Sequence, residues 1–206
     1  MYTDVVNWIR ACAPCQQWDA KRFQQAAGWT HPSPVPFAKW HLDIQYMPSS
    51  NKGKKCFLLE ARDDLTGFVE AAILPDKSSL SVQRFIKQTL LLRWGFPLAV
   101  VVDGGSEFKG EAQQILKDLN IQRISISPYN SQANGINEAG HIPIASSLAK
   151  MTQGTGKNWR ELLPYVLHAD RTALRGVLGR SPFSLVHNYE PMGLVEFDVP
   201  TWRTIN

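Results

Sequence analysis

The sequence predicts an α/β fold in which a five-stranded mixed sheet is flanked by helices. Apolar and polar residues alternate in the first half of the chain as they do in strands. An apolar run, LAVVV, has the composition of a buried parallel strand, and segments with helical spacing separate the later strands. Three strands, a helix, a strand, a helix, a strand and further helices follow in that order, which suits a sheet covered by helices.

The first three strands are expected to be adjacent and antiparallel. The segment KWHLDIQYMP, residues 39–48, alternates so that Asp43 lies on the face opposite the apolar side chains. The segments CFLLEARD at 56–63 and FVEAAILP at 68–75 follow as two further strands. The DDLTG between them ends at Gly67 and predicts a hairpin turn.

Two βα units are expected next. Ser78 and Ser79 offer caps for a helix that ends at Gly95. The buried strand at 98–102 then places Asp103 at its carboxyl end, where ligands gather in α/β sheets. A helix over about 107–119 precedes the last strand, which is marked by Ile121, Ile124 and Ile126.

The remaining helices follow the polar loop SPYNSQANG. The first of them is marked by the apolar residues Ile144, Leu148 and Met151. Asn158 and Glu161 have the spacing of a capping box for a helix that runs toward Leu174. Ser181 followed by Pro182 predicts the start of a final short helix.

The composition is that of one globular domain with a short appendage. The 206 residues are 44% apolar, which is ample for a hydrophobic core. The net charge of +4 permits a nucleic acid as partner without requiring one. We expect a soluble, unsecreted protein with no membrane segment, because long apolar runs and a signal peptide are both missing. The 3 cysteines favour a reducing compartment, and Cys56 within CFLL is expected to be buried.

The predicted domain organisation has four parts. The first segment is helical and ends in Cys12-Ala-Pro-Cys15, and the GWTHPSPVP run favours an extended connector after it. The parts are an N-terminal segment at 1–17, a proline-rich linker at 18–38, the main domain at 39–190 and a C-terminal extension at 191–206.

Three carboxylates stand on a strand, at a strand end and after a polar loop: Asp43, Asp103 and Glu138. Any one of them taken alone is better explained as a solvated surface acid. Together they could hold a pair of hard divalent cations about 3.5 to 4 Å apart, which clamp the attacking and leaving oxygens of a phosphoryl transfer. The residues thus indicate metal-dependent phosphodiester chemistry.

Four stretches carry a resemblance to a known family. They are DVVNWIRACAPCQ; WHLDIQYMP with ARDDLTG; VVDGGSEFKG with ISPYNSQANGINEAGH; and HADRTALRG with SPFSLV and VPTWR. The chain resembles the integrases of gypsy-class LTR retrotransposons, most closely the fungal ones, over nearly its whole length. The resemblance implies a ribonuclease H-like fold and a DDE-type polynucleotidyl transferase.

In that family the acids matching Asp43, Asp103 and Glu138 bind two Mg²⁺ or Mn²⁺ ions, the first acid bridging both. Glu138 follows Asp103 by 35 residues, close to the usual spacing. The implied reaction is 3′-end processing of the element's DNA followed by strand transfer into target DNA. The implied partners are double-stranded DNA and further copies of the chain, as a dimer or higher multimer. The implied location is nuclear or cytoplasmic, within a retroelement particle or at chromatin.

The polar loop is expected to meet the DNA end. The residues that match DNA-contacting positions of the family are Tyr129, Asn130, Gln132 and Asn134. Plain turn chemistry explains Asn134-Gly135 equally well.

The chain departs from the family pattern in two places. Cys12 and Cys15 have zinc-ligand spacing, but no histidine pair precedes them, so Zn²⁺ is expected only if a longer chain supplies one. Ala139 and Ile142 replace two basic residues beside the DNA. A domesticated or degenerate copy that binds DNA or protein without catalysis therefore stays open as an alternative. A ribonuclease H proper fits less well, since the SPYNSQANG loop does not support it.

Overall fold

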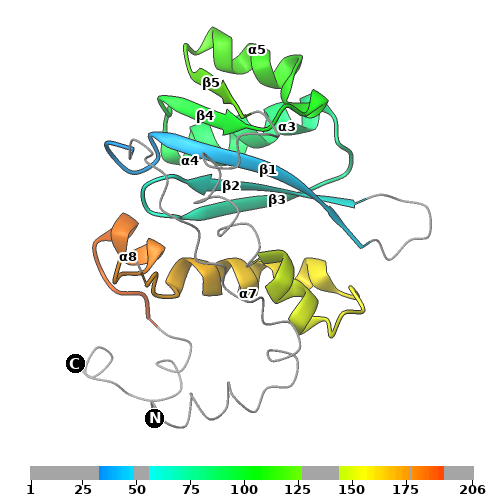
Figure 1. Cartoon of the computed structure of the whole chain (residues 1–206), viewed down its shortest axis with the longest axis vertical. Helices are drawn as coiled ribbons and strands as arrows, with labels where there is room; N and C mark the ends of the chain where they lie inside the picture. The colour runs from blue at the N-terminus through cyan, green and yellow to red at the C-terminus, as the bar shows by residue number, and fades with distance from the viewer. Residues whose placement is uncertain (1–32, 49–55, 127–143, 177, 193–206) are drawn as a thin grey trace.

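The chain is described from a computed structural model, which covers residues 33–48, 56–126, 144–176 and 178–192. Its centre is a sheet of five strands in the order β3-β2-β1-β4-β5 (Figure 1). The strands are β1 (Lys39–Met47), β2 (Cys56–Asp63), β3 (Val69–Leu74), β4 (Ala99–Val102) and β5 (Gln122–Ser125). The first three pair antiparallel, whereas β4 pairs parallel with both β1 and β5. The predicted five-stranded mixed sheet is confirmed.

Helices cover both faces of the sheet (Figure 1). One face packs under α3 (Ser79–Phe85) and α5 (Glu111–Asp118). The core residues on this side include Trp40, Leu42, Phe57, Leu59, Val82, Phe85, Val100 and Leu116. The other face packs under the helix at 144–151 and α7 (Trp159–Thr172) through a second core that includes Cys56, Leu58, Val69, Ile144, Leu148, Trp159 and Leu163. Because side chains alternate along a strand, β2 contributes to both cores, Phe57 and Leu59 to the first and Cys56 and Leu58 to the second.

The helix after β3 contains a wide turn. Ser78 caps α3 as predicted, since its side chain accepts a hydrogen bond from the Ser81 N–H. The helix continues through the π-helical turn η1 (Ile86–Leu91) into α4 (Leu92–Trp94). It ends at Gly95, whose φ of +87° favours glycine. The sequence pattern predicted the helix and its end but not the wide turn.

The segment after β4 is less regular than predicted. A 3₁₀ turn, η2 (Ser106–Phe108), comes first, and α5 begins only at Glu111. Gly110 separates the two with a φ of +58°. Phe108, Ala112 and Leu116 of this segment are buried, whereas Leu119 at its end is exposed.

The start of α7 corrects one prediction. Asn158 has a left-handed φ of 59° and makes no side-chain capping bond, so the predicted capping box with Glu161 is wrong. Instead the indole Nε1 of Trp159 donates to the Pro48 carbonyl oxygen at 2.7 Å, which fastens the helix to the end of β1. The predicted cap of α8 (Pro182–His187) is confirmed, because the Ser181 side chain accepts from the Ser184 N–H.

The segment before β1 packs on the sheet. Phe37 stacks on Trp40 with ring centroids 5.3 Å apart, and its N–H donates to Asp63 Oδ1 at 2.8 Å. The Ser33 N–H reaches Asp64 Oδ2 at 3.2 Å. Both aspartates belong to the predicted DDLTG turn, in which Gly67 has a φ of +70°. The predicted limits of the four parts of the chain stay predictions, and the N-terminal segment at 1–17 lies outside the described residues.

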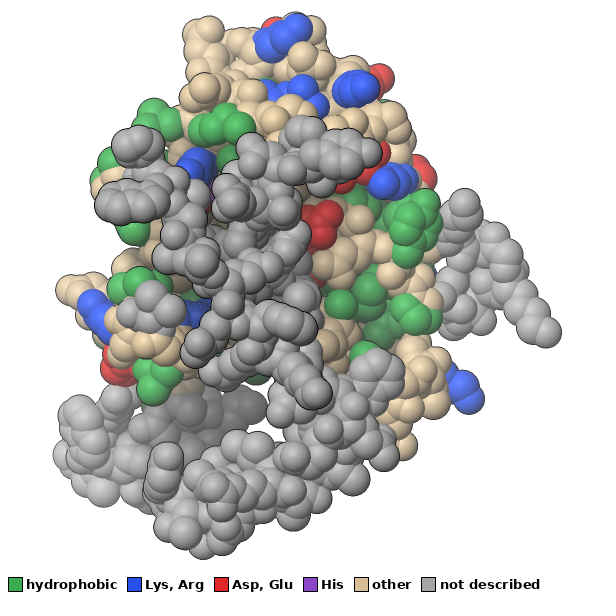
Figure 2. Space-filling model, viewed as in Figure 1, with side chains coloured by type: hydrophobic (Ala, Val, Ile, Leu, Met, Phe, Trp, Pro, Cys, Tyr) green, Lys and Arg blue, Asp and Glu red, His purple; other side chains and the backbone are tan. Residues whose placement is uncertain are grey.

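Among the described helices, none combines the length and the apolar character needed to cross a membrane. Over the α5 end of the molecule in Figure 2, Lys and Arg side chains lie among Asp and Glu side chains. The modest positive net charge of the chain is therefore not gathered into one basic patch on that part of the surface.

Candidate active site

Asp43 lies on β1, the middle strand of the sheet, and is half-buried. Trp40 and Leu42 belong to the first core. By strand alternation Asp43 therefore points to the opposite face, which α7 covers. The Gln45 amide, two residues further along the same face, donates a long hydrogen bond of 3.5 Å to Asp43 Oδ2.

Asp103 comes directly after β4 and is exposed. Its Oδ1 accepts a hydrogen bond from the Gly105 N–H at 2.9 Å, the geometry by which an aspartate orders its own turn. The carboxylate is therefore oriented by its turn while it remains open to solvent.

The parallel pairing of β1 and β4 leads toward the two aspartates. The last pair in this ladder is His41 with Val101. Asp43 and Asp103 each follow two residues later, Asp43 within β1 and Asp103 directly after β4. Strands that pair in a sheet lie about 4.8 Å apart, so the two aspartates are carried by neighbouring strands.

The other predicted site residues lie outside the described residues. They are the third acid Glu138, the loop residues Tyr129, Asn130, Gln132 and Asn134, and the cysteines Cys12 and Cys15. Within the described part of the chain, no three His, Cys, Asp or Glu side chains come together as a metal site. Of the three predicted carboxylates, the structure describes two, Asp43 on β1 and Asp103 directly after the neighbouring strand β4.

A lysine and a glutamate near Asp103 escaped the sequence analysis. Glu107 is buried, and its Oε1 lies 2.7 Å from Lys77 Nζ. The hydrogen bond to Glu107 raises the pKa of Lys77 against the effect of burial, and the charges of Glu107, Tyr46 and Asp103 raise it further. The sequence did show Glu107 within VVDGGSEF, close to Asp103. The helical pattern placed it at the start of a helix and gave it no other role.

A second glutamate, Glu60, was also missed. It is the direct antiparallel partner of Asp43 on β2 and is fully buried. Its neighbours Leu59 and Ala61 belong to the first core, so Glu60 lies on the same face as Asp43. Its place inside the apolar run CFLLEARD was the available signal, because a charged residue in a buried strand is unusual.

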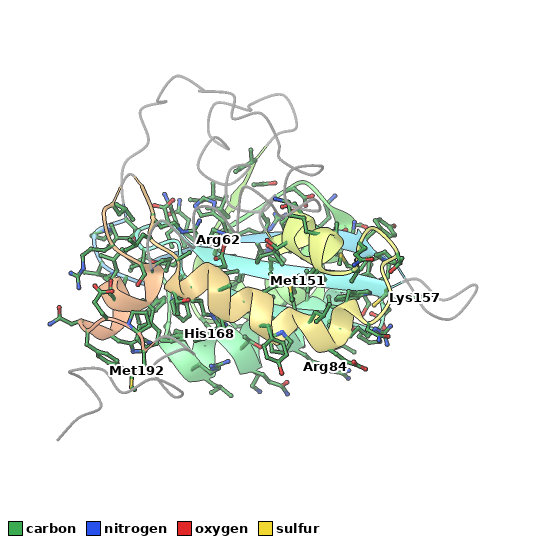
Figure 3. The ribbon with its side chains drawn as sticks, turned by 90° about the horizontal axis from the view of Figure 1, so that it is seen from below. Arg62, Arg84, Met151, Lys157, His168 and Met192 are labelled. Carbon is green, nitrogen blue, oxygen red and sulfur yellow. The ribbon has the colours of Figure 1, made fainter. Side chains whose placement is uncertain are left out.

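Ion pairs fasten α7 to the strands β2 and β3. Arg62 Nη1 lies 2.9 Å from Asp170 Oδ2. Arg171 Nη2 lies 2.9 Å from Glu70 Oε2, and burial is the main reason why the pKa of Arg171 is lowered. Figure 3 shows α7 across this face of the sheet with Arg62 beside it. Asp170 therefore helps to hold α7 against β2 through its ion pair with Arg62.

The donor set suits a hard divalent cation. Asp43 and Asp103 offer carboxylate oxygens, which Mg²⁺ and Mn²⁺ prefer. Thiol and imidazole ligands are not part of the pair. The side chains described at this end of the sheet fit a Mg²⁺ or Mn²⁺ site that needs at least one further oxygen ligand.

Comparisons with known proteins found similar sequences and similar folds. Residues 34–131 match the integrase core domain family. The chain is 28% identical over 192 residues to the Pol polyprotein of Radiation murine leukemia virus (strain Kaplan), which covers 92% of the chain and 32% of the polyprotein. It is 29% identical over 158 residues to the Gag-Pol polyprotein of Avian reticuloendotheliosis virus. This match covers 76% of the chain and 14% of that protein. The chain thus spans only a fraction of these relatives.

Solved structures share the fold. The catalytic core domain of BIV integrase is similar with a TM-score of 0.60 and 25% identity, over 74% of this chain and 95% of that one. A simian T-cell lymphotropic virus intasome in complex with the PP2A regulatory subunit B56 gamma is similar with a TM-score of 0.67 and 18% identity. The match covers 91% of this chain and 67% of that one. The HTLV-2 integrase catalytic core domain in complex with magnesium is similar with a TM-score of 0.58 and 17% identity. The match covers 74% of this chain and 97% of that one. The chain is therefore similar over residues 34–131 to the integrase core domain family, and its fold is that of retroviral integrase core domains.

Proposed function

We propose that this chain is an integrase catalytic core that performs 3′-end processing and strand transfer of retroelement DNA. The observation that supports this most directly is the parallel pairing of β1 with β4, whose last pair, His41 with Val101, lies two residues before Asp43 and Asp103 on the two strands. Two separate stretches of sequence are thus proposed to supply carboxylates to one site. A shared carboxylate site is what in-line phosphoryl displacement requires.

The third carboxylate is proposed to be Glu138. The chain leaves β5 beside the end of β4, since the Ile126 N–H donates to the Val102 carbonyl oxygen at 2.9 Å. It returns at Ile144, which packs on β2 and β3 on the face where Asp43 lies. The segment that contains Glu138 therefore connects the Asp103 end of the sheet to the Asp43 face.

The proposed cofactor is a pair of Mg²⁺ or Mn²⁺ ions held by Asp43, Asp103 and Glu138. When bound, such ions neutralise charge that develops on the phosphodiester and polarise the attacking oxygen. Magnesium is named in the structure of the HTLV-2 core domain, which has the same fold. Here Gln45 and the Gly105 N–H orient the two aspartate carboxylates by hydrogen bonds.

The proposed reaction exchanges phosphodiester bonds without an external energy source. In the first step a water oxygen forms a bond to phosphorus near the 3′ end and the former 3′ oxygen leaves. In the second step the freed 3′-hydroxyl forms a bond to a phosphorus of target DNA, and one P–O bond there breaks. Each step makes one P–O bond and breaks one, and no group is oxidised or reduced.

The polar loop and the wider setting belong to the same proposal. The DNA-end contacts are assigned to Tyr129, Asn130, Gln132 and Asn134, which precede Glu138 in the sequence. The element is proposed to be a gypsy-class retrotransposon of the fungal type, on the motif resemblance. Self-association as a dimer or larger multimer is proposed because the HTLV-2 core domain has trimeric and dimeric forms. The site of action would be at chromatin or in a cytoplasmic particle.

A second candidate function is DNA or protein binding without catalysis. The specific observation that favours it is Ala139 and Ile142 in place of the two basic residues of the family pattern. Each lost phosphate contact weakens DNA binding and lowers its dependence on salt. This alternative keeps the fold but predicts no product.

A strand-transfer assay separates the two candidates. The purified chain is given a duplex with the terminal sequence of its own element, a target duplex and Mg²⁺ or Mn²⁺. We expect product from the unaltered chain. The rate should fall at least about 100-fold in Asp43→Asn, Asp103→Asn and Glu138→Gln, because even the mutation of an outer-shell partner of a metal lowers affinity or activity about 10- to 100-fold. Asp118→Asn changes an exposed acid on α5 and should leave the rate unchanged.

Two results would count against the enzymatic proposal. One is DNA binding by the unaltered chain with no product under either cation, which supports the binding function instead. The other is an unchanged rate in Asp103→Asn, which removes Asp103 from the site. Circular dichroism and urea unfolding of every variant exclude misfolding as the cause of a loss.

A further inference from the structure

The ion pair between Lys77 and Glu107 joins two loops at the end of the sheet where Asp103 lies. Lys77 follows β3 and precedes α3, and Glu107 lies in η2, four residues after Asp103. Lys77 Nζ lies 2.7 Å from Glu107 Oε1, and the Glu107 side chain is 3% exposed. A buried glutamate with a charged partner at hydrogen-bond distance is a strong local contact.

A second set of contacts fastens the same two loops. The Ser79 hydroxyl donates a hydrogen bond to the Lys109 carbonyl oxygen, and its Oγ accepts one from the Ala112 N–H at 2.9 Å. Ser79 is the first residue of α3 and Ala112 lies in the first turn of α5. The segment from Asp103 to α5 is therefore held to the start of α3 at two places.

The Glu107 carboxyl also packs against the turn that orders Asp103. A Cβ atom added at Gly105 would lie 2.6 Å from the Glu107 carboxyl carbon, so the backbone and the carboxyl are in close contact there. The Gly105 N–H is the donor that holds Asp103 Oδ1. One backbone residue thus contacts both carboxylates, and a shift of Glu107 would be passed to Asp103.

Lys77 compensates the charge of Glu107 near the site. Its Nζ also lies 5.8 Å from the centre of the Tyr46 ring, over the end of β1. Glu107 without this cation would add a buried, uncompensated negative charge close to Asp103. Such a charge would be costly in itself and would compete for any cation that Asp103 attracts.

We propose that Lys77 and Glu107 form a positioning pair that fixes the Gly105 turn and thereby the Asp103 carboxylate, while Lys77 keeps Glu107 from acting as a metal ligand. The inference rests on the proposed function, in which Asp103 holds a catalytic cation. Neither residue is a catalytic residue in this proposal, because each acts through the turn. The competing explanation is that Glu107 itself binds the cation.

The variants are Lys77→Met, Glu107→Gln and the combined change, with Lys117→Met on α5 as the matched control for the loss of an exposed lysine. The first readout needs no cation. It is the hydrogen-exchange rate of the Gly105 amide, measured by NMR on the folded chain. We expect exchange to quicken about 10-fold or more in both single variants, no further change in the combined variant, and no change in Lys117→Met.

The second readout is the affinity for Mn²⁺, measured by calorimetry without DNA. We expect it to weaken about 10-fold in Lys77→Met and in Glu107→Gln, which is the range of outer-shell effects. Strand transfer should recover in these variants when Mn²⁺ is raised, whereas Asp103→Asn should not recover. A merely structural role would lower stability without this dependence on the cation.

Three outcomes overturn the proposal or separate it from the proposed function. Unchanged Gly105 exchange in folded Lys77→Met contradicts the positioning role. Abolished Mn²⁺ binding in Glu107→Gln together with tighter binding in Lys77→Met makes Glu107 a ligand and refutes the pair. If the unaltered chain binds no Mn²⁺ yet Gly105 exchange responds as expected, the proposed function fails and the positioning of the Asp103 turn stands.

Discussion

Arg62 on β2 and Asp170 on α7 form an ion pair of 2.9 Å in which both side chains are buried. The two residues are 108 positions apart, and their contact joins the sheet to the helix that covers its Asp43 face. Arg62 also donates to the Gly67 carbonyl oxygen at 2.9 Å, and Arg175 lies 2.8 Å from the same Asp170 oxygen. A cluster of this kind is sensitive to the loss of its one acid.

Replacing Asp170 by alanine should destabilise the fold by about 3 kcal/mol or more, because a buried guanidinium then lacks its carboxylate. Urea unfolding followed by circular dichroism measures the change. Arg175→Ala is the control, since its side chain is 27% exposed and the ion pair it removes should contribute at most about 1 kcal/mol. Equal losses in the two variants would contradict the bracing role of the Arg62 pair.

The pH dependence of stability should report on Asp64. Burial acts to raise the pKa of this carboxyl, but His41 at 2.7 Å and Lys39 at 3.0 Å outweigh it and hold the pKa below its ordinary value of 3.8. A lowered folded pKa means that the ionised group stabilises the fold above the unfolded pKa. That contribution is lost as the pH falls through the folded value.

The measurement is the difference in unfolding free energy between the unaltered chain and Asp64→Asn at several pH values. We expect a difference in favour of the unaltered chain at about pH 5, and a steady decrease below the ordinary pKa of 3.8. A difference that grows toward low pH would have the wrong sign for a lowered pKa.

Gly105 and Gly104 offer a matched pair at the Asp103 turn. A Cβ at Gly105 would meet the Glu107 carboxyl at 2.6 Å, whereas a Cβ at Gly104 would meet nothing within 4 Å. Gly105→Ala should therefore displace Glu107 and lower the strand-transfer rate about 10-fold at limiting Mn²⁺. Gly104→Ala should keep the rate within about twofold. The prediction is wrong if both variants behave alike in the same assay.

The second core, between the sheet and α7, should be sensitive to cavities. Leu58 on β2 is fully buried in this cluster. Leu58→Ala should cost about 2 to 5 kcal/mol of unfolding free energy, since buried contacts are lost and a cavity remains. Leu92→Ala removes a side chain that is 72% exposed and should change stability by about 0.5 kcal/mol or less. Thermal or urea unfolding of both variants checks the contrast.

Much of the sheet could be predicted from the sequence because its signals are local. Trp40, Leu42 and Ile44 alternate along β1, and four apolar residues in a row mark β4. Asp103 could be placed at a strand end for the same reason. That β1 and β4, the strands that carry Asp43 and lead to Asp103, lie side by side is favoured by the order of the elements.

The rest depends on contacts that sequence periodicity does not carry. Lys77 and Glu107 are 30 residues apart and meet because two loops meet, so neither stands out in its own segment. Asn158 and Glu161 have the residue types of a capping box, but asparagine also suits a left-handed φ, and here it has one. The Glu138 position and the DNA-contact loop stay predictions, because they lie outside the described residues.

The wide turn η1 sets the angular phase of the helix that follows β3. A π turn adds in effect one residue, and one residue corresponds to about 100° of rotation about the axis. Val82 can therefore be buried at the start of the helix while Trp94, at its end, still donates to Glu70 Oε1 at 3.0 Å. With one residue fewer, this segment would form a regular α-helix, and the Trp94 indole would point away from Glu70. The count of residues in this turn, and not only their chemistry, keeps the β3 edge in place.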